Sequence, residues 1–454
     1  MIRSENLGKS VYLVGIKGAG MAGLAQILKG LGFKVQGSDI ADTFFSDNIL
    51  KEKGIKVHAG FESSHISDDI NWAISSSAYL GATNNNQLPA NNQKNPEIEE
   101  LQKRNIPIVS YSEALGYFFN KAFGIAVTGT HGKSTTAAMI AYILEQAGKD
   151  PFALIGAELL NWHSNARVSK NPKPYTLNPK PYFVIEADEY REQFLNYRPN
   201  LLVITNIDYD HSDYFKTPED YANAFAKFKT QLKPKGVVIE GNNLKLKTGN
   251  LKLQLIGAHN QANGRIAYEA CRQLEVPHST IVDALKTFKG IRRRLERIGE
   301  YNNAVIIDDY AHHPQEVIAS LSALKEAYPR QKIVVLFHPH TYSRTQLFLK
   351  EFAKALSIAD EIYLLDIYGS AREVRGSVNP VRSRASQNAR SEGTSNGVSS
   401  DDLVEELQNL GRDALNLHTL EQATLYFAQH LHDNDVFITM GAGDVFRVAQ
   451  QLTT

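Results

Sequence analysis

The chain has 454 residues, more than one hydrophobic core usually supports, so length alone predicts roughly two to three domains. Hydrophobic residues make up 43% and charged residues 22% of it, and Lys+Arg and Asp+Glu are equal at 49 each, which excludes a disordered class and argues against nucleic-acid or anionic-membrane partners. The single cysteine, Cys271, excludes an internal disulfide framework. No apolar run approaches the roughly 20 residues that span a bilayer, and Met1–Gly15 lacks a secretory signal pattern, so we expect a cytoplasmic protein.

The chain begins with a predicted β-α-β unit. A buried strand at Val11–Val14 is followed by a glycine turn with Gly18, Gly20 and Gly23, then by a helix and a second strand that ends at Asp39. Such a turn lets the backbone approach a diphosphate at the helix N-terminus, and an acidic residue at the next strand end suits a ribose hydroxyl. Alone the pattern favours NAD, but it suits any nucleotide diphosphate, and a tight structural turn is the alternative.

A further strand is predicted at Ala73–Ser77, where Ser76 would present its hydroxyl to the same crevice. An ordinary strand-to-loop serine cluster is the alternative reading of this stretch. Residues 79–95 are rich in Asn and interrupted by Pro, which predicts a surface loop. We expect the first domain to end near residue 110, before the segment Tyr111–Phe119.

A second glycine turn lies between an apolar strand, Ile125–Val127, and a helical pattern that runs to Ala147. Strand, Gly-Lys-Ser and helix form the layout of a phosphate-binding loop, in which the lysine reaches the terminal phosphate and the serine hydroxyl can bind Mg²⁺. The full G-x-x-x-x-G-K-[ST] pattern would need glycine in place of Val127, so only its shorter form is present, and a glycine-rich turn with a surface lysine is the alternative. We predict a nucleoside-triphosphate site formed by Gly129, Thr130, His131, Gly132, Lys133, Ser134 and Thr135.

Carboxylates and a histidine follow the next two predicted strands. The strand Tyr182–Ile185 runs into Glu186, and the strand Leu201–Ile204 is followed by His211. Because parallel strands end at one edge of a sheet, we expect these groups to lie beside the phosphate loop, where they would hold Mg²⁺ and orient phosphoryl transfer. We choose Glu186, His211 and Ser134 as metal ligands, the histidine being the weaker choice because Mg²⁺ prefers oxygen. Acidic residues in a solvated loop are the alternative.

Two asparagines, Asn260 and Asn263, precede or open a helical run further on. Their amides offer paired donors and acceptors that could bind an adenine edge, although a helix N-cap is the alternative for Asn260.

The last third predicts a second α/β series. Four strands are expected at Ala304–Ile307, Ile333–Phe337, Ile362–Leu365 and Val436–Thr439. Polar and cationic residues follow each of them, so we expect a second ligand-facing edge, with Arg344 and Arg372 suited to carboxylates and phosphates. For any single histidine in this region a structural role is the alternative. The segment Ser377–Asn396 lacks periodicity, which predicts a disordered excursion.

Together these stretches resemble the Mur ligases, the ATP-dependent amide-forming enzymes of peptidoglycan precursor synthesis. The central-domain likeness is carried by Gly129–Ser134, Glu186–Glu189, Thr205–His211 and Gly257–Asn260. The resemblance covers nearly the whole chain apart from predicted insertions near 80–95, 163–180 and 377–396. It implies an α/β fold with three domains: a Rossmann-like UDP-sugar-binding domain (1–110), a central P-loop ATPase-like domain (111–294) and a Rossmann-like amino-acid-binding domain (295–454).

The activity that this resemblance implies is an ATP- and Mg²⁺-dependent ligation at the lactyl carboxylate of UDP-N-acetylmuramate, through an acyl phosphate. Three stretches favour L-alanine as the acceptor: Asp308–Pro314, Pro339–Thr345 and Ile367–Glu373. Glu186–Tyr190 and Tyr197–Pro199 are similar to members that attach an intact tripeptide, so that acceptor stays open. Either a monomer or a homodimer is compatible with the sequence. A nicotinamide-dependent oxidoreductase and a non-catalytic nucleotide-binding regulator are alternatives of other classes.

The resemblance also implies roles for single residues. Catalysis is expected of Lys133, Glu186 and His211. Asn260 and Asn263 would contact adenine, Asp308 its ribose, and Arg294 or Arg293 the phosphates. The UDP-sugar would bind at Gly18, Gly20, Gly23, Asp39 and Ser76. The amino-acid or sugar-nucleotide end would face His313, His340 and Arg344.

Overall fold

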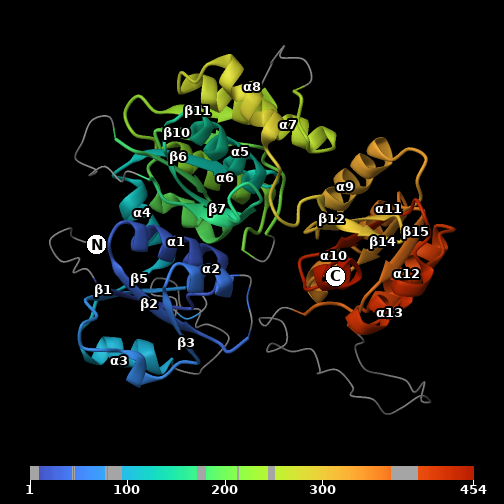
Figure 1. The fold of residues 1–454 in the computed structure, drawn as a ribbon, viewed down its shortest axis with the longest axis horizontal. Helices are drawn as coiled ribbons and strands as arrows, with labels where there is room; N and C mark the ends of the chain where they lie inside the picture. The colour runs from blue at the N-terminus through green and yellow to red at the C-terminus, as the bar shows by residue number, and fades with distance from the viewer. Residues whose placement is uncertain are drawn as a thin grey trace. The chain divides into compact units, whose positions relative to one another are not determined.

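The computed structural model describes residues 10–42, 44, 46–76, 79, 95–170, 180–211, 214–243, 251–369 and 397–454. Most of the loop predicted at 79–95, part of the insertion predicted near 163–180, the residue Arg372 and the excursion predicted at Ser377–Asn396 lie outside these residues. Contacts divide the chain into two compact units, Met1–Gln254 with Asn260–Arg292, and Leu255–His259 with Arg293–Thr454. Three β-sheets with helices packed on them are present, two in the first unit and one in the second, which agrees with the predicted α/β class (Figure 1).

The first sheet is parallel, with the strand order β3-β2-β1-β4-β5. Its strands are β1 (Ser10–Val14), β2 (Lys34–Asp39), β3 (Lys56–Ala59), β4 (Trp72–Ser75) and β5 (Ile108–Ser110). Its helices are α1 (Ala19–Gly30), α2 (Ser46–Glu52), α3 (Pro96–Lys103) and α4 (Tyr111–Phe119). The order reverses between β1 and β4, and ligands of such sheets bind where the strands end at this switch point. The predicted glycine turn follows β1 and so lies at that point.

The second sheet has the order β11-β10-β6-β9-β7-β8 and is parallel except for β8. Its strands are β6 (Phe123–Thr128), β7 (Phe152–Leu159), β8 (Ser164–Arg167), β9 (Tyr182–Glu186), β10 (Leu201–Ile204) and β11 (Val237–Glu240). Its helices are α5 (Lys133–Gln146), α6 (Pro218–Lys229), α7 (Ala258–Gln273) and α8 (His278–Thr287), with the short 3-10 helix η3 (Tyr190–Asn196). The strand β8 lies inside the region 163–180 that the sequence predicts as an insertion. The strand was not predicted because its residues Ser-Asn-Ala-Arg do not alternate between apolar and polar.

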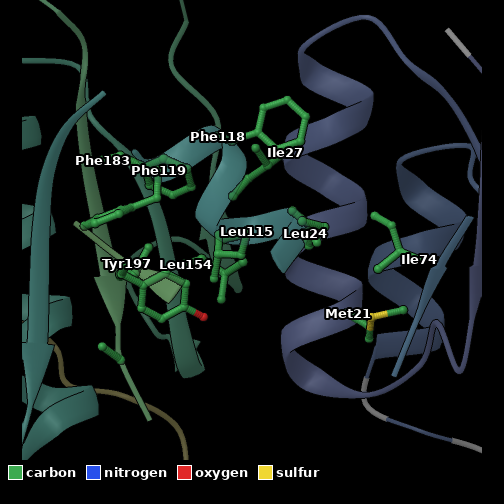
Figure 2. Packing of buried hydrophobic residues seen from close by; sticks show 14 of the residues in the cluster. Met21, Leu24, Ile27, Ile74, Leu115, Phe118, Phe119, Leu154, Phe183 and Tyr197 are labelled. Atoms are coloured by element: carbon green, nitrogen blue, oxygen red, sulfur yellow. The ribbon is translucent and has the colours of Figure 1, made fainter. Parts of the chain in front are cut away.

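One apolar core joins these two sheets. Figure 2 shows Met21, Leu24 and Ile27 of α1 near side chains from α4 and from the second sheet, among them Leu115 and Leu154. Close packing depends on glycine, because a Cβ on Gly23 would lie 3.2 Å from the Leu154 side chain and from Asn165. The Asn165 amide also donates to the Ala19 carbonyl at the start of α1, at 2.8 Å. The first glycine turn is therefore braced by the second sheet.

The third sheet has the order β12-β13-β17-β14-β15-β16, parallel except for β12. Its strands are β12 (Glu296–Tyr301), β13 (Ala304–Asp309), β14 (Ile333–Phe337), β15 (Glu361–Leu364), β16 (Ala414–Asn416) and β17 (Val436–Met440). Its helices are α9 (Pro314–Ala327), α10 (Tyr342–Leu347), α11 (Leu349–Leu356), α12 (Ser400–Asn409), α13 (Leu420–His430) and α14 (Phe446–Thr453). Separate apolar clusters cover its two faces, as expected for a doubly wound sheet. Among the residues described, no helix is long and apolar enough to cross a membrane.

Candidate functional site

The phosphate-loop prediction falls between β6 and α5, in the predicted strand-turn-helix order. Gly129 and Gly132 have φ angles of 128° and 79°, which side chains rarely adopt, so both glycines are required by the turn. Lys133 is the first residue of α5, and Ser134 and Thr135 follow it in the first helical turn. Because the first N–H groups of a helix have no acceptor within it, this end of α5 is suited to an anion.

The loop is braced by the strand end after β10. The Thr205 hydroxyl donates to the His131 carbonyl at 2.6 Å, and the Asn206 side chain bonds both the N–H and the carbonyl of His131 at 3.0 Å. The Thr130 hydroxyl bonds the Asp208 carbonyl at 2.6 Å. These contacts fix the loop before any ligand binds, which lowers the cost of ordering it.

Lys133 is tethered to a buried carboxylate. Its Nζ lies 3.0 Å from Glu189 Oε1 and also donates to the carbonyls of Gly129 and Thr130, at 2.6 and 3.1 Å. Burial alone would lower the pKa of Lys133, but the charges of Glu189, Asp188 and Glu186 outweigh it and raise that pKa overall. The side chain is therefore held as an ammonium group over the loop.

A cluster of two carboxylates and a histidine lies beside this lysine. Asp188, Glu189 and His211 each offer a ligand atom, and these atoms lie within 4.8 Å of one another. Glu189 is fully buried; its Oε1 also accepts from the Tyr221 hydroxyl at 3.2 Å, whereas its Oε2 has no hydrogen-bond partner in the described part of the chain. A buried carboxylate oxygen without a partner is costly, so it indicates a site for a cation or a donor.

Electrostatic interactions within the cluster shift the pKa values of its three members in different directions. Burial would raise the pKa of Glu189, but Lys133 and His211 lower it overall. Burial would lower the pKa of His211, but its bond to Glu189 and the charges of Asp210, Glu189 and Asp188 raise it overall. The Asp188 side chain reaches solvent, yet desolvation by the surrounding protein, followed by the Glu189 charge, raises its pKa.

The backbone around the cluster is unusual. His211, Arg191 and Glu192 have φ angles of 56°, 54° and 55°, although none of them is glycine. Left-handed non-glycine residues cost free energy and gather at functional sites.

The predicted ligand Glu186 lies at the end of β9 and outside the three-residue cluster. Its Oε2 accepts from the Gly156 N–H at 2.7 Å. Ser134 lies at the helix start, where the sequence places it. The sequence reasoning missed Glu189 as the partner of Lys133. Glu189 lies three residues beyond the end of β9, in a run that also contains Glu186 and Asp188, so no local pattern indicated which carboxylate would meet Lys133.

Both predicted adenine contacts lie within α7. Asn260 and Asn263 are buried, and neither is a helix N-cap. The Asn263 side chain approaches the phosphate loop so closely that a Cβ on Gly132 would lie 2.3 Å from its Oδ1. Asn263 therefore lies beside the phosphate loop, and its contact with adenine stays a prediction.

The first-sheet turn has one open glycine and two packed ones. Around Gly18 the space is open, since the nearest atom to an added Cβ is the Gly15 carbonyl at 3.8 Å, whereas at Gly20 it would lie 2.8 Å from the Tyr111 ring. Asp39 is buried, accepts from the Lys17 N–H at 2.7 Å and braces this turn. Burial is the main cause that raises the pKa of Asp39. Ser76 follows β4, and its N–H donates to the Val14 carbonyl at 3.0 Å.

In the second unit, the buried Asp308 pairs with the partly buried Arg293. Asp308 is fully buried, with its Oδ2 2.9 Å from Arg293 Nε and its Oδ1 2.6 Å from the Thr439 hydroxyl. Arg293 also donates to the carbonyls of Gly441 and Gly443, at 2.6 and 2.9 Å. Both partners are engaged in holding strand ends, whereas Arg294, 34% exposed, makes a looser ion pair with Glu316 at 3.5 Å. Of the two arginines, Arg294 is the more exposed.

The predicted amino-acid contacts lie near one another on the third sheet. The Arg344 guanidinium is 3.3 Å from His340 Nδ1, and the His340 ring stacks on Tyr368 with centroids 5.8 Å apart. His313 is the N-cap of α9, accepting from the Gln315 N–H at 3.4 Å, and its ring contacts Phe348. The Arg344 guanidinium therefore donates to His340, and His313 has a structural role in starting α9.

Comparisons with known proteins cover nearly the entire chain. Three family models match in succession: "Mur ligase family, catalytic domain" over residues 10–122, "Mur ligase middle domain" over 127–248 and "Mur ligase, glutamate ligase domain" over 293–443. A relative from Desulfitobacterium hafniense, named UDP-N-acetylmuramate–L-alanine ligase, is 32% identical and covers 97% of this chain and 99% of its own length. One of the same name from Clostridium acetobutylicum is 32% identical, with 98% of each chain covered.

Solved structures agree with these matches. The UDP-N-acetylmuramate-alanine ligase of Thermotoga maritima has a TM-score of 0.76 at 25% identity, with 98% of each chain covered. A murein peptide ligase from Psychrobacter arcticus has a TM-score of 0.65 at 21% identity over 98% of each chain, which shows a shared fold.

Proposed function

The chain belongs to the Mur ligase family, and we propose from this that it joins L-alanine to the lactyl carboxylate of UDP-N-acetylmuramate, with cleavage of ATP to ADP and phosphate. The observation that carries the proposal is the tethered Lys133 on a phosphate loop beside the Asp188–Glu189–His211 cluster. Relatives named for L-alanine ligation are 32% identical over 97–98% of this chain, so L-alanine is favoured over a tripeptide acceptor.

The reaction needs activation because amide formation from a free carboxylate in water is uphill. A lactyl carboxylate oxygen attacks the γ-phosphorus of ATP, the bond to the β-γ bridging oxygen breaks, and an acyl phosphate and ADP form. The neutral amine of L-alanine then attacks the acyl carbon, a tetrahedral intermediate forms, and inorganic phosphate leaves as the amide is completed.

The residues of the loop support the first step by charge. Lys133 as an ammonium group stabilises the negative charge that the transferring phosphoryl group carries in the transition state. The N-terminal N–H groups of α5 bind phosphate oxygens, and the Asn263 side chain lies against the loop at Gly132. We place the adenine at Asn260 and Asn263, the UDP-sugar at Gly18, Gly20, Gly23, Asp39 and Ser76, and the phosphates at Arg294.

The donor set fits a divalent cation. Two carboxylates and an imidazole lie within reach of one another, and Glu189 Oε2 is buried without a partner. We propose that Asp188, Glu189 and His211 hold Mg²⁺, with Ser134 and Glu186 as further oxygen donors. Bound there, the ion would neutralise phosphate charge.

The proposed reaction consumes ATP and a UDP-sugar, which are nucleotides of the cytoplasm, so we propose that the protein acts there. Its partners are then these small molecules rather than nucleic acid or membrane.

The test is an assay of phosphate release with UDP-N-acetylmuramate, ATP and Mg²⁺, comparing L-alanine, other amino acids and the tripeptide. We expect phosphate and an L-alanyl product identified by mass, with L-alanine preferred. Preference for the tripeptide would overturn the acceptor assignment. Absence of ADP with every acceptor would favour a non-catalytic regulator, and binding of NADH would favour an oxidoreductase.

A further inference from the structure

A fully buried asparagine lies between the first glycine turn and the second sheet. Asn165 is in β8, and its side-chain nitrogen donates to the Ala19 carbonyl at 2.8 Å and to the Ile155 carbonyl at 3.3 Å. Ala19 stands between Gly18 and Gly20 in that turn, and Ile155 is in β7. One side-chain amide therefore joins the turn at which we place the UDP-sugar to a strand of the second sheet.

The neighbours of Asn165 fix the direction of its amide. Gln26 Nε2 donates to Asn165 Oδ1 at 3.4 Å, and the Ser164 hydroxyl donates to Gln26 Oε1 at 2.9 Å. Because a carbonyl can only accept, the side-chain nitrogen of Asn165 must be the atom that faces Ala19 and Ile155. Gln26 and Ser164 are buried as well, so bulk water cannot replace a bond that is lost in this network.

The peptide group that accepts from Asn165 also donates to Glu186. Its carbonyl belongs to Ile155 and its N–H to Gly156, which donates to Glu186 Oε2 at 2.7 Å. The pairing of β7 with β9 ends one residue earlier, at Leu154, and beyond it these two side chains bind both polar groups of the peptide. Hydrogen bonds at the two ends of one peptide group polarise it and strengthen each other.

Glu186 lies beside the strand that leads into the phosphate loop. It is paired with Val127 of β6, the strand that ends just before the loop. Its carboxylate is one of the further oxygen donors that we propose for Mg²⁺. A continuous series of hydrogen bonds thus runs from Ala19 through Asn165 and the peptide 155–156 to Glu186, and we call it the Asn165 bridge.

We propose that Asn165 is a positioning residue for the phosphoryl-transfer step, because it holds the UDP-sugar turn and Glu186 in one arrangement. The inference rests on the proposed ligase function and deepens it. Asn165 is fully buried, so it acts through its contacts and not by touching a substrate. A sugar nucleotide that orders Ala19 also orders the Asn165 amide and, through the peptide, the Glu186 side chain. MgATP then meets a carboxylate that is already ordered, which lowers the free-energy cost of its binding.

Two pairs of variants test the Asn165 bridge in the full-length protein. Asn165→Asp keeps the shape of the side chain but removes both N–H donors, and Asn165→Ala removes the amide altogether. Asn161→Asp and Asn161→Ala are the matched controls. The Asn161 amide also joins two backbone groups, donating to the Thr287 carbonyl at 3.0 Å and accepting from the Lys289 N–H at 2.8 Å. These partners lie at the end of α8, outside the Asn165 bridge.

The first readout is binding without turnover. The ligand is an ATP analogue with nitrogen in place of the β-γ bridging oxygen, and calorimetry with Mg²⁺ gives its Kd with and without saturating UDP-N-acetylmuramate. We expect the sugar nucleotide to lower this Kd about fivefold or more in wild type and in both Asn161 variants. In both Asn165 variants the ratio of the two Kd values should fall to about one, because the sites are no longer joined.

The second readout is a double-mutant cycle on kcat. Asn165→Asp is combined with Glu186→Gln, and the loss in the double variant should be smaller than the product of the two single losses by about threefold or more, because either substitution breaks the same bridge. Asn161→Asp and Glu186→Gln share no contact, so their losses should multiply.

A wild-type ratio of Kd values in the Asn165 variants, or a ratio of about one in wild type, would overturn the inference. Losses that multiply for Asn165→Asp and Glu186→Gln would overturn it as well. If Asn165→Ala fails to fold, Asn165→Asp decides alone. Wild-type protein that releases no phosphate with any acceptor would instead refute the proposed function, whereas phosphate release without coupled binding would refute only the role of Asn165.

Discussion

Lys133 Nζ lies 3.0 Å from Oε1 of Glu189, a carboxylate that is fully buried. The pair joins the phosphate loop to the segment after β9. The Lys133 ammonium group, which would meet a phosphate, is therefore held in position before a nucleotide binds. The second oxygen of Glu189 has no partner in the described residues, so it can accept from a further donor or bind a cation.

Replacing the lysine should separate activity from stability. We expect Lys133→Met to lower ADP formation by about 10²–10³-fold, because a charge that stabilises the transition state is lost. It should also lower the melting temperature, since breaking a buried pair strands one charge at a cost of about 3–5 kcal/mol. Adding Glu189→Gln to Lys133→Met should recover stability but not activity. Substantial ADP formation in Lys133→Met would remove the loop from the mechanism.

Substitutions of Glu189 and Glu186 should differ in how far they raise the Mg²⁺ concentration that the enzyme requires. Glu189→Gln should raise the Mg²⁺ concentration for half-maximal ADP formation well above that of Glu186→Gln, because Glu186 Oε2 already accepts from the Gly156 N–H. Chelation of the metal should stop wild-type turnover. Titration of ADP formation with Mg²⁺ measures both effects. A larger shift in Glu186→Gln would return the metal to the ligand that the sequence favoured.

A pair of left-handed glycines offers a matched test of Asn263. Gly132 has a φ of 79° with Asn263 Oδ1 2.3 Å from an added Cβ, whereas Gly148 has a φ of 69° and nothing within 4 Å. Both alanine substitutions carry backbone strain on the order of 1 kcal/mol. Only Gly132→Ala should displace Asn263 and raise KM for ATP, by about tenfold. Equal KM values in the two variants would mean that Asn263 takes no part in binding ATP.

The buried Asp309 should give stability a distinct pH dependence. Burial raises the pKa of Asp309 from 3.8 to about 6, despite bonds from the Ala311 N–H and the Ser320 hydroxyl. Between these pH values the folded carboxyl holds a proton that the unfolded chain has released, so this group lowers stability as pH rises from about 4 to about 6. Asp309→Asn does not titrate, and from pH 4 to pH 7 its stability should rise relative to wild type by about 3 kcal/mol.

Melting temperatures of wild type and Asp309→Asn across this range would show the effect as a changing difference. Curves that stay parallel from pH 4 to pH 7 would contradict the raised pKa.

Much of the fold follows from local sequence pattern. The apolar runs at Val11–Val14 and Ile125–Val127 could be predicted as strands because a glycine turn and an amphipathic helix follow each of them. These signals are local in the sequence. The antiparallel strands β8 and β12 were missed, since Ser164–Arg167 and Glu296–Tyr301 are polar or irregular and are stabilised by neighbours distant in sequence. The shared core between the first two sheets also depends on tertiary contacts such as Gly23 with Leu154. The domain boundaries at 110 and 294 stay predictions.

The site was predicted in part, and for the same reason. A glycine-lysine-serine turn is a local motif, so the loop could be located from sequence. Which of Glu186, Asp188 and Glu189 pairs with Lys133 depends on side-chain direction after the strand end, which a run of acidic letters does not specify. The closeness of Gly132 to Asn263 joins residues 131 positions apart and needed the fold.

The central claim is that ATP activates the lactyl carboxylate by phosphoryl transfer, and an isotope experiment tests it most directly. UDP-N-acetylmuramate carrying heavy oxygen in that carboxylate would be incubated with ATP, Mg²⁺ and L-alanine, and the released phosphate analysed by mass. Our account predicts that phosphate contains one heavy oxygen per turnover, since the acyl phosphate leaves with an oxygen from the carboxylate. Phosphate without the label, formed together with the L-alanyl product, would contradict it.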